Sequence, residues 1–257
     1  MSNFGNYPFY LSVAKRDFTD HRYLTVIGYN GDVNNATEDA ISTGGNINYP
    51  AAAGIQMQIV STSVNDTAAG TGIRQVELHY LDANLNELDE IIILNGVTPV
   101  NTVATNIRRV LGIHGIAVGT NSVASGIIKL TDITGVTTYC QIEAGINTHR
   151  FGMFTIPLGW TGYILGWHPG SGSDSSTHYT NFLLRATAHD DEGTIEWLDG
   201  VFHIWSQSGS QDNETNIIFP VPLQMPAGTD IKISAISDNV TSRVKCTVEI
   251  YLLLIQN

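Results

Sequence analysis

Apolar and polar residues alternate with a period of two along much of this 257-residue chain. Near the C-terminal end, Val244, Cys246, Val248, Ile250 and Leu252 alternate with charged and polar residues. Successive side chains of a β-strand point to opposite faces, so this pattern predicts a strand with one buried face. No long segment shows the 3.6-residue period of an amphipathic helix. The alternation therefore predicts an all-β fold.

Further strands are expected at many places along the chain. Alternation or β-favouring apolar runs predict them at residues 23–28, 55–63, 76–80, 90–94, 126–130, 137–143, 151–156, 163–167, 182–187, 201–205 and 231–235. The turn signals between these runs are Asn30-Gly31, Asn95-Gly96, Asp199-Gly200 and Pro226-Ala227-Gly228. Many strands at a spacing of about ten residues are typical of antiparallel sandwiches and barrels.

The chain is long enough for two domains of ordinary size. We expect an N-terminal arm at residues 1–22, followed by two antiparallel, jelly-roll-like β-sandwich domains at residues 23–143 and 144–257. No flexible linker marks the boundary between the two domains. It rests on chain length and on the resemblance given below.

Aromatic residues are the candidate contacts with a partner or a second subunit. The arm holds four of them without regular alternation, and such a segment needs either its own core or a neighbouring subunit to pack on. More aromatics lie in the second half of the chain. They are interpreted either as residues that pack between the sheets or as residues that stack on sugars. The predicted contact residues are Phe4, Tyr7, Phe9, Tyr10, Trp160, Trp167 and Tyr179.

Charge excludes several classes of partner. The formal net charge is −12, and no run of Lys or Arg occurs. Binding to nucleic acid or to an anionic membrane surface is therefore not expected. The chain has no apolar stretch of bilayer length, and its first residues do not resemble a signal peptide. The two cysteines, Cys140 and Cys246, lie among apolar neighbours and are expected to be buried and unbridged.

No sequence motif indicates catalysis, a cofactor or a metal ion. The chain lacks a nucleophile elbow, a P-loop, a dinucleotide fingerprint and the common zinc spacings. The segment Asp82–Asn86 starts like a calcium loop, but Glu87 and Ile93 occupy the positions of its glycine and its bidentate glutamate. It is interpreted as a hairpin turn, and the acidic cluster at residues 189–192 as a solvated turn. We expect a protein without enzymatic activity.

One stretch of the chain resembles a known class of proteins. The string at residues 59–76, IVSTSVNDTAAGTGIRQV, and its continuations at residues 80–84 and 94–100 are similar to virion structural proteins of tailed bacteriophages and other large DNA viruses. Residues 219–233 resemble the last strands of phage sandwich domains more loosely. The resemblance implies a non-enzymatic component of a virus particle, assembled in the host cytoplasm.

Within that class, the first hypothesis is a capsid decoration, or cement, protein on the outside of a phage head. Its main partner would be the major capsid protein, and the chain would form a homo-oligomer, with a trimer favoured. The alternatives are a tail, baseplate or fibre component, and a carbohydrate-binding or receptor-binding β-sandwich module. With only 14% charged residues, attachment is expected to rest on apolar burial and neutral hydrogen bonds rather than on ion pairs.

Overall fold

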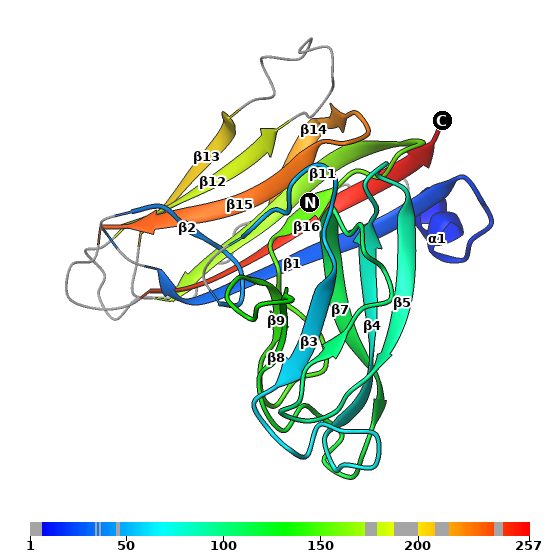
Figure 1. Ribbon diagram of the computed structural model, residues 1–257. Helices are drawn as coiled ribbons and strands as arrows, with labels where there is room; N and C mark the ends of the chain where they lie inside the picture. Colours follow the sequence, from blue (N-terminus) through cyan, green and yellow to red (C-terminus); the bar gives the residue numbers. More distant parts are fainter. Residues whose placement is uncertain are drawn as a thin grey trace.

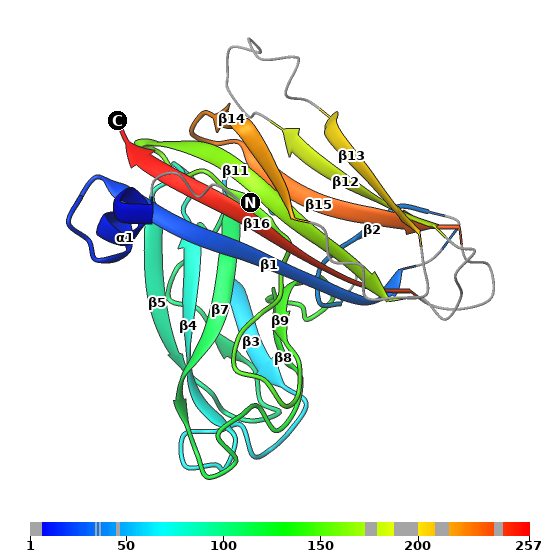
Figure 2. The same cartoon turned by 180° about the vertical axis from the view of Figure 1, so that it is seen from behind.

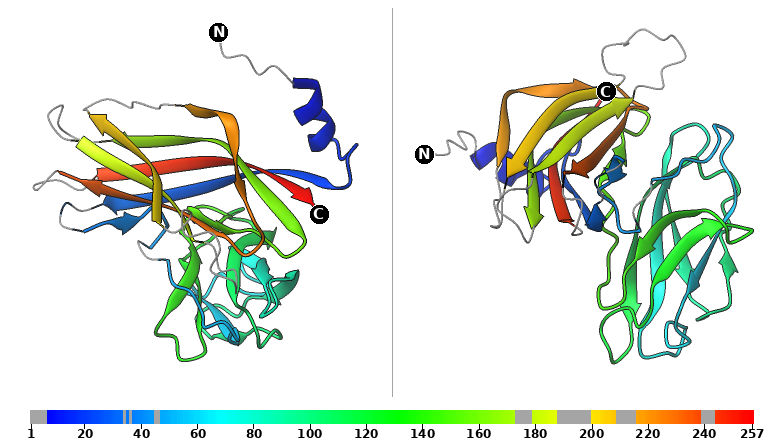
Figure 3. Two further views of the ribbon diagram at one scale, coloured as in Figure 1. Left: turned by 90° about the horizontal axis from the view of Figure 1, so that it is seen from above. Right: turned by 90° about the vertical axis from the view of Figure 1, so that its left-hand side faces the viewer.

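The computed structural model describes residues 7–33, 35, 37–44, 47–172, 179–187, 200–208, 216–238 and 244–257. In this part of the chain, one short helix, α1 (Tyr7–Ala14), precedes strands that form four antiparallel sheets (Figure 1). The expected all-β fold is confirmed. Figures 1 and 3 show α1 and the C-terminus at the same end of the molecule.

Two of the four sheets enclose the first hydrophobic core. One has the order β1 (His21–Val33), β16 (Val244–Gln256), β11 (Trp160–Gly172) and β14 (Ile217–Met225). The other has the order β10 (Met153–Thr155), β15 (Asp230–Ser237), β12 (Tyr179–Thr187) and β13 (Gly200–Ser208), with β2 (Asp39–Ala40) paired to β15. Both sheets contribute buried side chains to this core. We call these two sheets the terminal unit, because they contain the first and last strands.

The other two sheets enclose a second core. One has the order β6 (Val100–Asn101), β3 (Met57–Ser61), β8 (Ile128–Asp132) and β9 (Thr138–Ile142). The other has the order β5 (Glu87–Ile93), β4 (Ile73–Leu81) and β7 (Arg109–Val118). Their buried side chains form a separate cluster. We call this part the inserted unit, because residues 57–142 lie between strands of the terminal unit.

The first strand of the chain pairs with the last. The β1–β16 register runs antiparallel from His21↔Ile255 to Val33↔Val244, and Figure 2 shows β16 between β1 and β11. The expected first domain, residues 23–143, contains both residues 23–33 and the strands of the inserted unit. In the structure, residues 23–33 instead pair with the C-terminal strand β16. Alternation identifies the buried face of a strand but not the strand that pairs with it.

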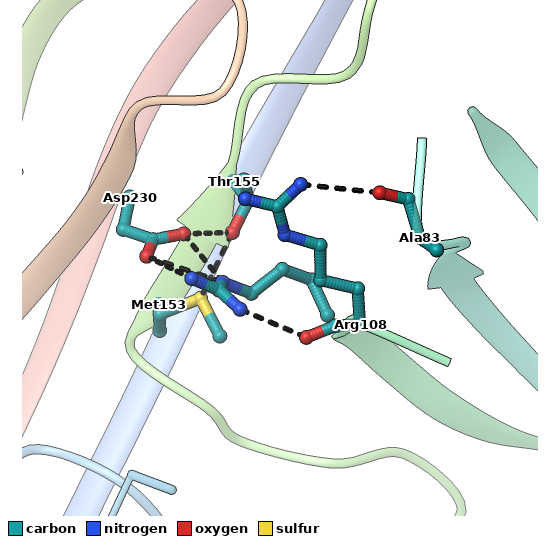
Figure 4. Close-up of polar contacts among 6 residues, drawn as sticks. Ala83, Arg108, Met153, Thr155 and Asp230 are labelled. Carbon is teal, nitrogen blue, oxygen red and sulfur yellow. Dashed lines mark hydrogen bonds and ion pairs between the residues drawn. The ribbon is translucent and has the colours of Figure 1, made fainter. Parts of the chain in front are cut away.

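A buried ion pair joins the two units. The guanidinium of Arg109 on β7 donates from Nε and Nη2 to the carboxylate of Asp230 on β15 over 3.0–3.1 Å. Thr155 donates its hydroxyl to the same carboxylate at 2.5 Å, and Figure 4 shows Thr155 and Met153 beside Asp230. The Arg109 guanidinium also lies 4.7 Å from the centre of the Tyr49 ring.

Apolar side chains cross the same junction. Leu81 of β4 and Leu111 of β7 are buried in the core of the terminal unit. Conversely, Met153 of β10 is buried in the core of the inserted unit. The two units therefore meet through interlocking side chains and one buried charge pair.

One expected turn is replaced by a continuous strand. The pair Asn30-Gly31 predicts a turn, but β1 continues through both residues to Val33, with an irregular register between Asn30 and Val33. The Asn30 side chain explains the irregularity, because it accepts a hydrogen bond from the Asp32 N–H and donates one to the Ala40 carbonyl. These local bonds support a bulge within the strand rather than a hairpin.

Both cysteines are free and buried, as their apolar neighbours predicted. Cys140 belongs to the inserted core and Cys246 to the terminal core. Burial raises the pKa of the Cys140 thiol to about 12, and burial raises the pKa of Cys246 as well. Both thiols are therefore protonated at neutral pH and pack as small apolar side chains.

Candidate assembly surface

The sheet β1–β16–β11–β14 has one face on the core and one face away from it. Along β16, the side chains from Val244 to Leu254 at even positions lie in the terminal core. The intervening residues, Lys245, Thr247, Glu249, Tyr251 and Leu253, therefore point to the opposite face. We call this face, with its neighbours on β1, β11 and β14, the outer sheet face.

Aromatic and aliphatic side chains gather at one end of the outer sheet face, whereas the exposed residues Lys245 and Thr247 lie at the other end of β16. Leu253 pairs with Tyr23 on one side and with Tyr163 on the other, so the three side chains form a row across β1, β16 and β11. On β1, Ile27 is 45% exposed and Tyr23 is 41% exposed. On β14, Ile218 is 50% exposed. Exposed apolar side chains therefore lie on the two edge strands of this sheet, β1 and β14, whereas Leu253 between them is 7% exposed.

The charged residue Glu249 lies on the same face as Tyr251, two positions before it on β16. The Tyr251 hydroxyl donates a long hydrogen bond of 3.4 Å to the Glu249 carboxylate. Burial raises the pKa of the Tyr23 hydroxyl, and the nearby Glu249 carboxylate raises it further. Tyr23 is therefore a neutral hydrogen-bonding group at physiological pH. A face of this composition suits a contact that buries apolar area with hydrogen bonds around it.

The N-terminal helix extends this face at one end. Phe9 of α1 lies 5.5 Å from Tyr10 and 5.7 Å from Phe18, between ring centroids. Tyr10 in turn lies 5.9 Å from Tyr23 on β1. Because Tyr23 belongs to the row with Leu253, the aromatic residues of the arm are continuous with the outer sheet face. Edge-to-face ring pairs of this kind fix the position of the helix on the strand.

The structure distributes the seven predicted contact residues over different environments. Phe4 and the side chain of Tyr7 lie outside the described part of the chain. Phe9 and Tyr10 lie in the aromatic group just described. Trp160 is half-buried at the start of β11, and the Arg22 guanidinium lies 5.3 Å from its ring centre.

The remaining two predicted residues have opposite exposures. Trp167 is fully buried in the terminal core, so its side chain offers no surface to a partner. Tyr179, at the start of β12, is 53% exposed but belongs to the other sheet of the terminal unit. The structure therefore brings Phe9 and Tyr10 together, and it adds Tyr23 as a neighbour that the sequence did not single out.

A cleft of about 410 Å³ is lined by β1 and β10 of the terminal unit, by the inserted unit and by residues 148–150. Three histidines from different elements line it: His79 on β4, His114 on β7 and His149 after β9. Their ring centroids are 5.2 Å apart between His79 and His114 and 4.8 Å apart between His114 and His149. We call this the histidine cleft. Its other lining residues are Arg22, Leu24, Thr25, Val26, Ile27, Glu87, Leu111, Thr148, Arg150, Met153 and Phe154.

The three histidines have different electrostatic surroundings. His79 contacts Asp89 at 2.5 Å and Glu77 at 3.2 Å. Burial lowers the pKa of His114, and the neighbouring His79 lowers it further. Burial also lowers the pKa of His149 to about 4, with a smaller effect from His114. His149 is therefore neutral at physiological pH.

No sequence signal linked these histidines. The sequence placed His79 in an expected strand, but it did not show that this strand, β4, pairs with β7, which holds His114. In the described part of the chain, no three His, Cys, Asp or Glu side chains are arranged to hold a metal ion. No helix there is long and apolar enough to span a bilayer. The acidic cluster at residues 189–192 lies outside the described residues.

The string at residues 59–76 builds a loop around one buried carboxylate. Asp66 is fully buried, and its two oxygens accept hydrogen bonds from the N–H groups of Ile73, Ser125 and Gly126 and from the Ser61 hydroxyl. A Cβ at Gly72 would lie 2.0 Å from Asp66 Oδ1. The string therefore specifies a local structure of the inserted unit.

The predicted hairpin turn at Asp82–Asn86 is present between β4 and β5. The Asp82 carboxylate accepts hydrogen bonds from the N–H groups of Asn84 and Asn86 at 2.8 and 2.9 Å. Leu85 takes a positive φ of 64°. The carboxylate thus organises the turn through local bonds of the kind that aspartate commonly makes.

Comparison with known proteins gives little similarity. No family model matches the chain, and no curated protein matches it. Among solved structures, the T=1 particles derived from infectious bursal virus share 10% identity over 92% of this chain and 74% of that chain, with a TM-score of 0.19. The Gx strain of infectious bursal disease virus shares 8% identity over 92% and 77%, also with a TM-score of 0.19. Similarity at this level establishes no relationship in fold.

Proposed function

We propose that this chain is a non-enzymatic structural protein of a virus particle, which binds the outer surface of a phage head as a decoration, or cement, protein. The observation that carries the proposal is the outer sheet face, where exposed apolar and neutral aromatic side chains continue into the N-terminal helix. The resemblance of residues 59–76 to virion structural proteins supports the same class. The role needs a contact surface and no catalytic residues.

The fold proposed for this function is a pair of sandwich-like units of jelly-roll type. Each pair of sheets contributes side chains from both of its members to one core, which is the packing that a β-sandwich requires. Antiparallel sheets without helical covering offer broad faces for contact. The terminal unit presents the outer sheet face, and the inserted unit projects from the terminal unit (Figure 1).

The partners follow from the chemistry of the surface. We propose that the outer sheet face contacts the major capsid protein or a second copy of this chain, and that the chain assembles as a trimer in the virion. Closed symmetry repeats one modest contact several times and so increases the overall affinity. The net charge of −12 disfavours attachment to nucleic acid or to anionic lipid.

A sugar-binding role is less well supported. Stacking on a sugar ring requires an accessible aromatic face, but Trp167 is fully buried and the Arg22 guanidinium lies over the ring of Trp160. A tail, baseplate or fibre location uses the same kind of contact surface as a capsid location. It is therefore distinguished by the position of the protein on the particle.

The proposal is tested by binding the purified protein to particles that lack it, followed by sedimentation. We expect Tyr23→Asp and Ile218→Asp to reduce binding at least tenfold, because each places a charge in the contact. Ile91→Asp is the matched control, since Ile91 is an exposed apolar residue on β5 of the inserted unit. Bound protein should remain attached in molar NaCl. Equal binding by all variants, or quantitative release by moderate salt, contradicts the proposal.

A further inference from the structure

The strand β1 has one unpaired edge. It lies at the end of its sheet and pairs only with β16 among the described strands. Four consecutive residues, Leu24 to Ile27, line the histidine cleft, so the open edge of the strand faces that cleft. Within the described part of the chain, the main-chain groups of these residues make no backbone hydrogen bond other than those to β16. An open edge of this kind is a template for another strand.

The cleft has room for a short extended segment. Its volume of about 410 Å³ lies within the range of ligand-binding pockets, about 300–1,000 Å³. The four residues of β1 span about 10 Å at roughly 3.3 Å per residue. Leu111, Met153 and Phe154 line the same cleft, where the buried side chains of the two cores reach its wall.

The cleft also holds a cation that has no carboxylate partner among the described residues. Arg22 forms an ion pair with Glu87 in the same cleft, with contacts of 2.5 and 3.0 Å. Arg150 has no such pair in the described part of the chain: its guanidinium lies 4.1 Å from the centre of the Tyr29 ring, and its buried Nε lacks a hydrogen-bond partner. Because the guanidinium has no carboxylate partner there, an acidic group that enters the cleft can form a charged hydrogen bond with its terminal nitrogens.

From these observations we infer that the histidine cleft binds an extended segment of a partner polypeptide, which adds to β1 as a strand and places an acidic side chain against Arg150. Main-chain hydrogen bonds to β1 supply affinity, and the alternate side chains that face the opposite wall of the cleft supply specificity. Those side chains are apolar toward Leu111 and Phe154 and acidic toward Arg150. The site uses the edge of β1, whereas the proposed attachment uses the outer sheet face, and Ile27 belongs to both surfaces.

The probe is the capped peptide Ac-TVTETVT-NH2, whose valines and glutamate share one face when it is extended. Its analogues carry Gln or Lys in place of the glutamate. Affinity is measured by fluorescence anisotropy with a labelled peptide, and the contact is located by amide hydrogen exchange. We expect the glutamate peptide to bind about tenfold more tightly than the glutamine peptide, as one charged hydrogen bond would give. We also expect new protection of those amides at residues 24–27 that point away from β16.

Three variants separate the acidic contact from general effects. Arg150→Gln should abolish the preference for glutamate, and Arg150→Lys should retain it. Arg185→Gln is the matched control, because Arg185 pairs with Glu38 away from the cleft. Absence of binding at millimolar peptide, equal binding of the three peptides, or unprotected β1 amides at saturation would each overturn the inference. Failure of the proposed attachment to particles would leave these results unchanged.

Discussion

Arg109 and Asp230 lie 121 residues apart in the chain, yet their side chains meet in a buried ion pair across the junction of the two units. The Thr155 hydroxyl adds a third group to this contact. A buried charge is costly unless it is paired and hydrogen-bonded, so each partner depends on the other. The pair therefore couples the position of β7 to that of β15.

Removing one member of this pair should strongly destabilise the protein. Arg109→Met leaves the Asp230 carboxylate buried without its cation, at an expected cost of about 3–5 kcal/mol in the free energy of unfolding. Urea denaturation measures the change. Arg185→Met is the control, since the partly exposed Arg185–Glu38 pair should contribute only about 0–1 kcal/mol. A loss below about 1 kcal/mol for Arg109→Met would show that the pair does not hold the units together.

Acid should weaken the fold through His149. Its pKa is about 4 in the folded protein, against 6.5 as its ordinary value. The His149 side chain therefore binds a proton more readily in the unfolded chain than in the folded protein. The free energy of unfolding is unaffected by this group above pH 6.5 and decreases as the pH falls from 6.5 toward 4. The loss amounts to up to about 3 kcal/mol for this group. Denaturation at several pH values measures it.

A variant without a titrating group at this position is the control. His149→Phe keeps a planar ring but loses the hydrogen bond from the Ile113 N–H to the imidazole. We expect it to be less stable at neutral pH and to show a shallower decline between pH 6.5 and 4. An unchanged slope would mean that other groups cause the acid sensitivity.

Asp66 should be indispensable to the inserted unit. In Asp66→Ala, the N–H groups of Ile73, Ser125 and Gly126 lose their acceptor inside the protein. Each unsatisfied buried group costs about 1–3 kcal/mol, so we expect a total loss above about 3 kcal/mol. Asp132→Ala is the comparison, since Asp132 organises an exposed turn. Urea denaturation of both variants measures the loss in the free energy of unfolding. Equal losses for the two variants would contradict the prediction that Asp66 is indispensable to the inserted unit.

The N-terminal arm should contribute to assembly. Deletion of residues 1–17 removes Phe9 and Tyr10 and uncovers Tyr23 on the outer sheet face. We expect light scattering to show a trimer for the full chain and a smaller species after deletion. Circular dichroism should stay that of a folded β protein, because neither core includes a described residue of the deleted segment. A full chain that is already monomeric would contradict this prediction.

Strand locations could be predicted from the sequence because burial of one face of a strand produces a local alternation of apolar and polar residues. The alternation from Val244 to Leu252 corresponds to β16. No local sequence pattern indicated which strands pair with each other. The pairing of β1 with β16 joins strands from opposite ends of the chain, and only the packing of the whole chain selects it.

The candidate sites were predictable in part for the same reason. Phe9 and Tyr10 stood out as aromatics without alternation, whereas Tyr23 and Tyr163 each belong to an ordinary strand. Their common row depends on both being paired with Leu253. The histidine cleft depends on the junction of two units, which no local pattern encodes.

The most direct measurement of the central claim is an electron cryomicroscopy map of the virus particle that carries this protein. We expect density for the chain on the outside of the head, with the sheet β1–β16–β11–β14 turned toward a neighbouring subunit and Tyr23 and Ile218 in the contact. Density on the tail alone, absence from the particle, or an outer sheet face open to solvent in every copy would contradict the proposed function.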